Sequence, residues 1–236
     1  MKPKYKRVLF KLSGEGLMGD RAFGMDEQTI SSLAKQIKTV HDKGVEICIV
    51  VGGGNIFRGA KEASKGLNRS VADQVGMLAT VMNALYLQNA IEQTGVPSRV
   101  MSGINIPSVC ESYIYRRALR HLEKGRVLIF AGGIGNPYFT TDSCAALRAS
   151  EMGCDAILKA TQVDGVYSDD PKINSKAKRY DSITYDEVIK KNLKVMDIAA
   201  VALARDNNIP IVVFAQKGKD SLINVIYGKE KFTLIK

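Results

Sequence analysis

The chain has 236 residues, of which 45% are hydrophobic and 25% are charged, and this composition excludes a wholly disordered protein. No run approaches the roughly 20 apolar residues of a membrane-spanning helix. The basic start is followed only by the short apolar run Val8–Leu12, which is too short for a secretory signal. We therefore expect a cytoplasmic protein whose residues 1–236 form one domain.

The net charge is +10, from 34 Lys and Arg against 24 Asp and Glu. A basic balance indicates either an anionic partner or a solvated basic surface. Trp is absent, which argues mildly against a surface on which bases stack. A basic nucleic-acid-binding protein remains an alternative, although we expect no stable nucleic-acid partner and no membrane partner. The four cysteines lack C-x-x-C spacing and only two histidines are present, so we expect no metal site built from protein ligands.

Apolar runs typical of buried strands alternate with helical patterns along the chain. The runs lie at residues 8–12, 45–51, 99–101, 127–131, 156–159 and 211–214. The helical patterns lie between Asp26, as an N-cap, and Gly44, and at residues 71–91, 143–152, 185–192 and 197–207. Residues 163–167 are interpreted as an excursion and 232–235 as a closing strand. This alternation predicts an α/β fold, a three-layer αβα sandwich around a mostly parallel sheet.

Three glycine-rich segments follow predicted strands, at Lys11–Gly16, Gly52–Gly59 and Gly132–Pro137. Ligands of such sheets bind where the carboxyl ends of parallel strands meet. Glycine lets the backbone approach a ligand closely, and helix N-termini attract anions. Each turn alone could be a tight connection, but the three together predict a phosphate site.

The common phosphate-binding motifs are missing. Asp20 stands where a P-loop needs its lysine, and Phe57 and Tyr138 occupy the last glycine position of a dinucleotide fingerprint. A site of glycines and cations suits phosphoryl transfer, which needs positioned positive charge. Lys11 could neutralise the transferred group, and Arg58 could bind a second phosphate with its forked guanidinium.

Two aspartates have both a structural and a functional interpretation. Asp142 opens a predicted helix and could be its N-cap, or it could orient a lysine or share a magnesium ion among phosphates. Asp73 lies early in the long helix and could accept hydrogen bonds from ribose hydroxyls. Its position alone better fits an ordinary carboxylate in a first helical turn.

Four segments together resemble the amino acid kinase superfamily: Lys11–Glu15, Gly52–Gly59, Gly135–Asp142 and Lys159–Tyr167. Within it, three more resemble the bacterial uridylate kinases: Gly76–Thr80, Lys194–Asp197 and the ending Gly228–Ile235. The resemblance covers nearly the whole chain. It implies the amino acid kinase fold and transfer of the ATP γ-phosphate to UMP, giving UDP and ADP, in de novo pyrimidine nucleotide biosynthesis. Another small-molecule kinase of this fold, with a different acceptor, remains an alternative.

The resemblance also implies site residues. The implied catalytic residues are Lys11, Asp142 and Asp197. The implied ATP contacts are Lys11, Leu12, Ser13, Gly14, Gly54, Arg58, Thr161, Tyr167 and Asp170. The implied UMP contacts are Gly53, Asp73, Ile134, Gly135, Asn136, Pro137, Tyr138, Phe139, Thr140 and Thr141. Mg²⁺ would be held mainly by the nucleotide phosphates.

Members of this family are hexamers that GTP activates and UTP inhibits, which implies a homohexamer with the same effectors here. The loop tied to GTP activation corresponds to Gly19, Asp20, Arg21, Ala22, Phe23 and Gly24. Ile134 stands where relatives often have a hydroxyl residue. Gln88 and Glu92 stand where some relatives present basic residues to GTP.

Overall fold

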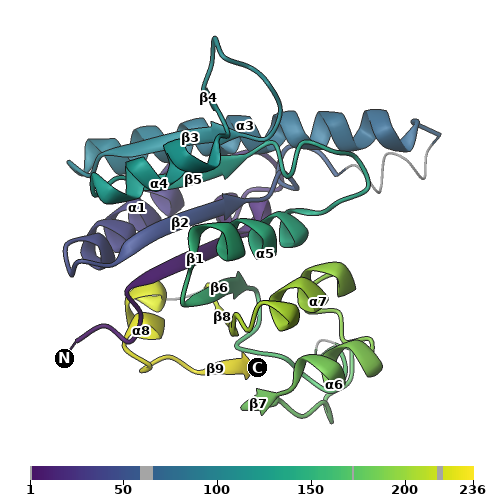
Figure 1. Ribbon diagram of the computed structural model, residues 1–236. Coiled ribbons are helices and arrows are strands. Elements are labelled where there is room, and N and C mark those ends of the chain that lie inside the picture. The colour runs from purple at the N-terminus through teal and green to yellow at the C-terminus, as the bar shows by residue number, and fades with distance from the viewer. Residues whose placement is uncertain (1, 59–65, 172, 217–219) are drawn as a thin grey trace.

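The computed structural model describes residues 2–58, 66–171, 173–216 and 220–236 (Figure 1). Gly59, the last residue of the second glycine segment, lies outside them. The strands are β1 Arg7–Leu12, β2 Glu46–Val51, β3 Ser98–Ser102, β4 Glu111–Ser112, β5 Val127–Ala131, β6 Ala156–Thr161, β7 Ser182–Ile183, β8 Ile211–Ala215 and β9 Phe232–Ile235. The helices are the 3₁₀-helix η1 Gly14–Leu17, α1 Glu27–His41, α3 Arg69–Gln93, α4 Tyr115–Glu123, α5 Thr141–Met152, α6 Tyr185–Lys190, α7 Ile198–Asp206 and α8 Ser221–Ile226.

The strands form one sheet in the order β4-β3-β5-β2-β1-β6-β8-β9-β7. Within the described part of the chain, every strand pair is parallel except β8 with β9. The predicted mostly parallel sheet is therefore confirmed, and residues 232–235 are the closing strand. Strands β5, β2 and β1 are neighbours, so the three glycine-rich turns that follow them lie along one edge.

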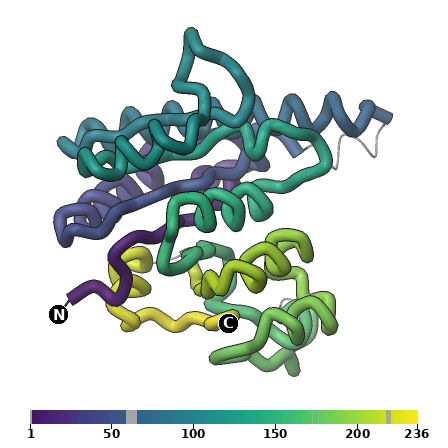
Figure 2. The backbone as a smooth tube through the Cα atoms, viewed as in Figure 1, coloured from purple at the N-terminus to yellow at the C-terminus, as the bar shows by residue number. Residues whose placement is uncertain are grey.

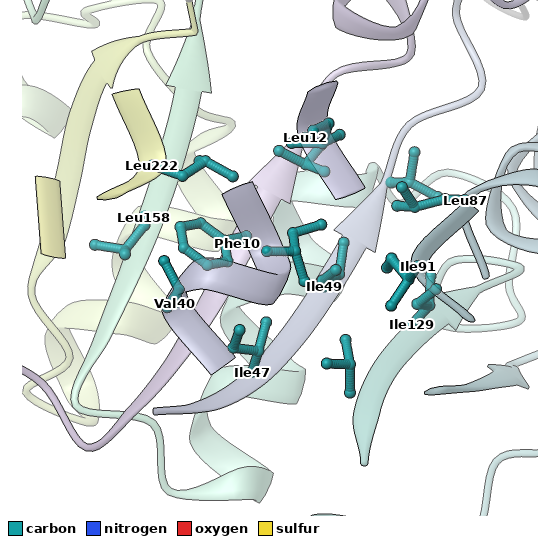
Figure 3. Packing of buried hydrophobic residues seen from close by; sticks show 14 of the residues in the cluster. Phe10, Leu12, Val40, Ile47, Ile49, Leu87, Ile91, Ile129, Leu158 and Leu222 are labelled. Atoms are coloured by element: carbon teal, nitrogen blue, oxygen red, sulfur yellow. The ribbon is translucent and has the colours of Figure 1, made fainter. Parts of the chain in front are cut away.

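Side-chain alternation in the central strand divides the core into two layers. Val8, Phe10 and Leu12 pack with α1, α3 and α8 on one face of the sheet, as Figure 3 shows for Phe10 and Leu12. Leu9 packs with α4, α5, α6 and α7 on the other face. These layers form the predicted αβα sandwich. By the same alternation, Lys11 lies on the face that α5 covers.

The predicted helices are all present, with boundaries shifted by a few residues. Asp26 caps α1 by accepting a hydrogen bond from the Thr29 amide, as predicted. Residues 163–167 leave the sheet, and an isolated antiparallel bridge pairs Tyr167 with Arg179. Helices α4 and α8 were not predicted from the sequence. No helix in the described ranges combines the length and apolarity needed to cross a bilayer.

Candidate active site

Two lysines and one aspartate form a buried ionic cluster at the carboxyl ends of the central strands. Lys11 of β1 and Lys159 of β6 are partners in the parallel register, and each is only 8% exposed. Lys159 Nζ donates a hydrogen bond of 2.8 Å to Asp142 Oδ2. Lys11 Nζ lies 2.8 Å from Asp142 Oδ1 but outside hydrogen-bond geometry. Two ammonium groups thus share one carboxylate, which leaves an excess of positive charge for an anion.

The start of α5 places Asp142 over this pair. Thr140 is the N-cap, and its Oγ1 accepts hydrogen bonds from the amides of Asp142 at 3.0 Å and Ser143 at 3.4 Å. The interpretation of Asp142 as the N-cap is therefore wrong. Because Thr140 satisfies the helix terminus, the Asp142 carboxylate reaches the two lysines instead of bending back to its own backbone.

Lys159 belongs to the cluster although no role was predicted for it. The pKa of Lys159 is lowered to about 8, mainly by burial; the Lys11 charge also lowers it, and Asp142 opposes both effects. Burial would raise the pKa of Asp142, but the two lysine charges outweigh burial and hold it below its usual value. The sequence did carry one signal for this role: Lys159 is a charged residue at the end of the otherwise apolar run of β6.

The depressed pKa of Lys159 predicts that this lysine makes stability rise with pH between 8 and 9. In that range the unfolded chain, with a lysine pKa near 10.5, holds more protons at this site than the folded protein. The lysine should then add up to about 1.4 kcal/mol per pH unit to the free energy of unfolding. The thiols of Cys48 and Cys144 oppose this trend in the same range, because folding raises their pKa values above the ordinary value of 9.0. Urea unfolding of the unchanged protein and of Lys159→Met at pH 8 and 9 isolates the lysine contribution, since both keep the thiols. The slope should be lower in Lys159→Met; equal slopes would contradict the prediction.

Asp197 lies beside the cluster, where it joins two helices. Its carboxylate caps α7 by accepting a hydrogen bond from the Ala200 amide at 2.7 Å. The same carboxylate accepts hydrogen bonds from the hydroxyls of Thr140 and Ser143, the latter at 3.0 Å. Asp197 therefore fixes the start of α5 and with it the position of Asp142.

A cavity of about 230 Å³ opens next to the cluster, between the first turns of α3 and the turns after β2 and β5. It brings together seven predicted residues: Gly53, Gly54, Asp73, Asn136, Phe139, Thr140 and Thr141. It is also lined by residues to which we had given no role: Phe57, Arg69, Ala72, Gly76, Met77, Thr80 and Gly133. Gly135, Pro137 and Tyr138 belong to the same loop but do not line the cavity. The Ile134 side chain packs against the core on the α5 face.

Asp73 fastens the loop over this cavity to α3. Its Oδ2 accepts a hydrogen bond of 2.8 Å from the Tyr138 amide, and the Arg69 guanidinium lies 2.8 Å from the same carboxylate. Tyr138 has φ 71°, a left-handed conformation that is unusual for a residue other than glycine. The Asp73 contact helps to hold this strained backbone at the cavity mouth.

The glycine turns after β1 and β2 are packed directly against each other. A Cβ on Gly14 would lie 2.8 Å from the Gly54 amide nitrogen, so a side chain there would push the turns apart. Buried Asn83 locks the second turn, since its Nδ2 donates hydrogen bonds to the Gly52 carbonyl at 2.7 Å and to Asn55 Oδ1 at 2.6 Å. Sequence reasoning gave Asn83 no role, because nothing local marks a helical asparagine as buried.

The remaining predicted ATP contacts from β1 and the turn after β2 differ in exposure. The Leu12 side chain is fully buried in the core, so only its backbone faces the turn. Ser13 caps η1 by accepting a hydrogen bond from the Gly16 amide. Arg58 is exposed and lies 2.5 Å from Glu15. None of these three lines the 230 Å³ cavity.

The end of β6 and the segment after it carry the other predicted ATP contacts. Thr161 ends β6, two residues beyond Lys159, and its hydroxyl donates a hydrogen bond to the Val163 carbonyl. The Tyr167 hydroxyl donates to Asp164 Oδ1 at 2.6 Å, and Asp170 is exposed. These residues lie on the β6 side of the cluster, whereas the 230 Å³ cavity lies on the β2 and β5 side.

A second cavity of about 540 Å³ lies between η1, the start of α1 and the start of α8. Gly19, Asp20 and Arg21 of the predicted effector loop line it, while Phe23 of the same loop is 66% exposed. The loop ends at Gly24, whose carbonyl accepts a hydrogen bond of 2.9 Å from Asn55 Nδ2. Ala22 is exposed. The predicted effector loop is thus connected to the glycine turn after β2.

The part of the chain that the structure describes holds no group of three or more His, Cys, Asp or Glu side chains arranged for a metal ion. Asp142 is engaged by two lysines and Asp197 by a helix terminus and two hydroxyls. A divalent cation at this centre would therefore depend on ligands from a bound substrate.

Comparison with known proteins connects this geometry to a family. The model of the amino acid kinase family matches residues 6–215. The uridylate kinase of Paramagnetospirillum magneticum is 58% identical over 232 residues, which cover 98% of this chain and 97% of that protein. The uridylate kinase of Hyphomonas neptunium is 59% identical over 234 residues, covering 99% and 93%. The crystal structure of UMP kinase from Ureaplasma parvum is similar with a TM-score of 0.93 at 39% identity, covering 99% of both chains.

Proposed function

Because this chain belongs to the amino acid kinase family, we propose that it phosphorylates UMP, taking the γ-phosphate of ATP and giving UDP and ADP. The observation that carries the proposal is the buried Lys11–Asp142–Lys159 cluster beside the cavity that holds most of the predicted acceptor residues. The reaction would belong to pyrimidine nucleotide biosynthesis. We place it in the cytoplasm, where both nucleotides are available, and assign it to the whole chain as one kinase domain.

The site supports direct in-line transfer. A phosphate oxygen of UMP attacks the γ-phosphorus, and the bond from that phosphorus to the bridging oxygen of ATP breaks as ADP leaves. Charge spreads over the transferred group, so positioned cations stabilise the transition state. Lys11 and Lys159 supply these cations, and Asp142 keeps both ammonium groups aimed at one point.

The other predicted residues act around this centre. Asp197 acts through Thr140 and Ser143 and is a positioning residue. Mg²⁺, when bound, would neutralise phosphate charge while the nucleotide phosphates hold it, because the carboxylates at the centre are already engaged. Arg58 and Gly54 would contact the donor phosphates from the turn after β2.

An assay of ADP release with a panel of acceptors tests the proposed function. The panel contains UMP, CMP, AMP, GMP, glutamate and aspartate, each with ATP. UMP should be preferred; preference for another acceptor would favour a different small-molecule kinase of this fold. Tight, steeply salt-dependent binding to nucleic acid without kinase activity would favour the nucleic-acid-binding alternative.

Replacing Asp73 by alanine should mainly raise the KM for UMP. The change removes the carboxylate proposed to bind the ribose and also frees the Tyr138 amide that closes the loop. An increase of roughly tenfold to a hundredfold in KM corresponds to the loss of one or two charged hydrogen bonds. Steady-state kinetics with each substrate varied in turn measures this, and a change in the ATP KM alone would show that the acceptor pocket is misassigned.

We propose that α3 mediates self-association within the implied homohexamer. Exposed apolar side chains follow one another at helical spacing on this helix: Val71, Val75, Leu78, Met82 and Tyr86. A second copy of the chain could bury this stripe by packing helix against helix.

We also propose that GTP activates this assembly and that UTP inhibits it. Gln88 and Glu92, which stand where some relatives present basic residues to GTP, lie on α3. Glu92 pairs with Arg99 at 3.3 Å.

Replacing Met82 by glutamate should weaken this association. Met82 is 52% exposed in the middle of the stripe, and a buried unpaired carboxylate opposes association. Sedimentation should show smaller species than for the unchanged protein at the same concentration. Ile173→Glu is the matched control, because Ile173 is exposed and apolar but far from the stripe in the sequence. An unchanged sedimentation profile for Met82→Glu would place the interface elsewhere.

A further inference from the structure

The closing strand β9 carries a buried hydroxyl that contacts the excursion, by which we mean the chain between β6 and β7. The excursion leaves the sheet along one limb, which contains Val166, and returns along a second limb, which contains Tyr180. Thr233 of β9 is 0% exposed. Its Oγ1 accepts a hydrogen bond of 2.8 Å from the Val166 amide and donates one to the Tyr180 carbonyl. The Tyr180 amide in turn donates to the Val166 carbonyl at 2.8 Å. Thr233 therefore fixes the base of the excursion from both sides, and Figure 2 shows the C-terminal strand alongside this part of the chain.

The excursion carries residues proposed to contact the adenosine end of ATP. Tyr167 follows Val166 directly, and Asp170 lies three residues further on. Beyond the base, the backbones of the limbs meet through the Ser168 amide, which donates to the Lys178 carbonyl at 2.9 Å. The positions of Tyr167 and Asp170 thus depend on how firmly Val166 is held.

Gly165 shows that the contact requires a close approach. A Cβ at this position would overlap the Thr233 hydroxyl, so the excursion can reach β9 only with glycine there. The hydrogen bonds of the Thr233 hydroxyl therefore depend on the absence of a side chain at Gly165. Packing alone would not need the hydroxyl, because valine has nearly the same shape as threonine.

We propose that Thr233 is a positioning residue for the donor nucleotide, holding the excursion through Val166 and Tyr180 so that Tyr167 and Asp170 meet ATP. The inference rests on the proposed function for the identity of the donor. Thr233 touches neither substrate. Without its hydroxyl, a buried N–H and a buried carbonyl would lose a partner, and the base of the excursion would loosen. The acceptor cavity lies on the other side of the lysine cluster and should be unaffected.

The test is Thr233→Val in the full chain. We expect the KM for ATP and the dissociation constant for ATP without acceptor to rise about tenfold, the effect of about one lost buried hydrogen bond. The KM for UMP and the kcat at saturating ATP should stay within about twofold. Thr233→Ser keeps the hydroxyl and should restore ATP binding. Thr94→Val is the matched control, since it removes a helix-terminal hydroxyl that bonds to Ile91 away from both sites.

Equal rises in both KM values, or a lower melting temperature with ATP binding unchanged, would overturn the inference. If Thr233→Val does not fold, amide exchange in the unchanged protein decides: ADP should slow exchange at Val166 more than UMP does, and equal protection would contradict the proposal. Calorimetry measures ATP binding in the absence of UMP, so this test does not require phosphorylation of an acceptor. A failure to phosphorylate UMP would therefore overturn the proposed function without deciding the role of Thr233.

Discussion

Replacing Lys11 by alanine should lower kcat by roughly 10²- to 10³-fold, the usual cost of losing one positioned group that stabilises transition-state charge. Lys11 Nζ lies 2.8 Å from Asp142 Oδ1, so this carboxylate orients the Lys11 charge before a phosphate binds. Its charge matters most in the transition state, when the phosphoryl group lies between ATP and UMP. The KM for UMP should therefore change little, because no Lys11 atom lines the acceptor cavity.

The fold should survive this change. Removing Lys11 leaves Asp142 paired with Lys159, which is a balanced buried ion pair rather than an isolated charge. Lys35→Ala on the exposed face of α1 is the control for loss of a lysine outside the site. Steady-state kinetics and urea unfolding should show lost turnover with retained stability. An unchanged kcat would remove Lys11 from the transfer step.

The sequence allowed the fold and the position of the site to be predicted, because both depend on local signals. Apolar runs mark buried strands whatever they pair with, and glycines after β1, β2 and β5 mark the edge where backbones approach a ligand. Helix α4 was missed although Ala118, Leu119 and Leu122 stand at helical spacing, because charged residues dominate the segment. The signal for this helix was present in the sequence.

The ionic cluster could not be predicted in full, because it depends on pairing between distant segments. Lys11 and Lys159 meet only because β1 and β6 are neighbours in this register. The consecutive residues Thr140, Thr141 and Asp142 can each cap a helix, and nothing local selects Thr140. The choice is settled by Asp197, which holds the Thr140 hydroxyl from another helix. Thr233 is a similar case, since its partners are 53 and 67 residues away.

Replacing Asp142 by asparagine should both destabilise the protein and abolish most of its turnover. The two ammonium groups would remain buried without a counter-charge, and breaking a buried ion pair costs about 3–5 kcal/mol. The pKa of Lys159 should fall further, because the Asp142 charge is the main interaction that opposes the effect of burial. Raising the pH should then recover stability as Lys159 loses its proton. Activity should not recover, because the lost proton removes a cation from the site.

The double variant Asp142→Asn with Lys159→Met separates these two effects. It removes one positive charge together with the negative one, so urea unfolding should show most of the lost stability restored, and the part of the pH dependence that Lys159 causes should disappear. Its kcat should stay as low as that of the single variant, because Lys11 lacks its orienting partner and the second cation is gone. If turnover returned together with stability, Asp142 would serve only to keep two lysines buried, and the alignment of their charges on the transferred phosphate would have to come from the substrates themselves.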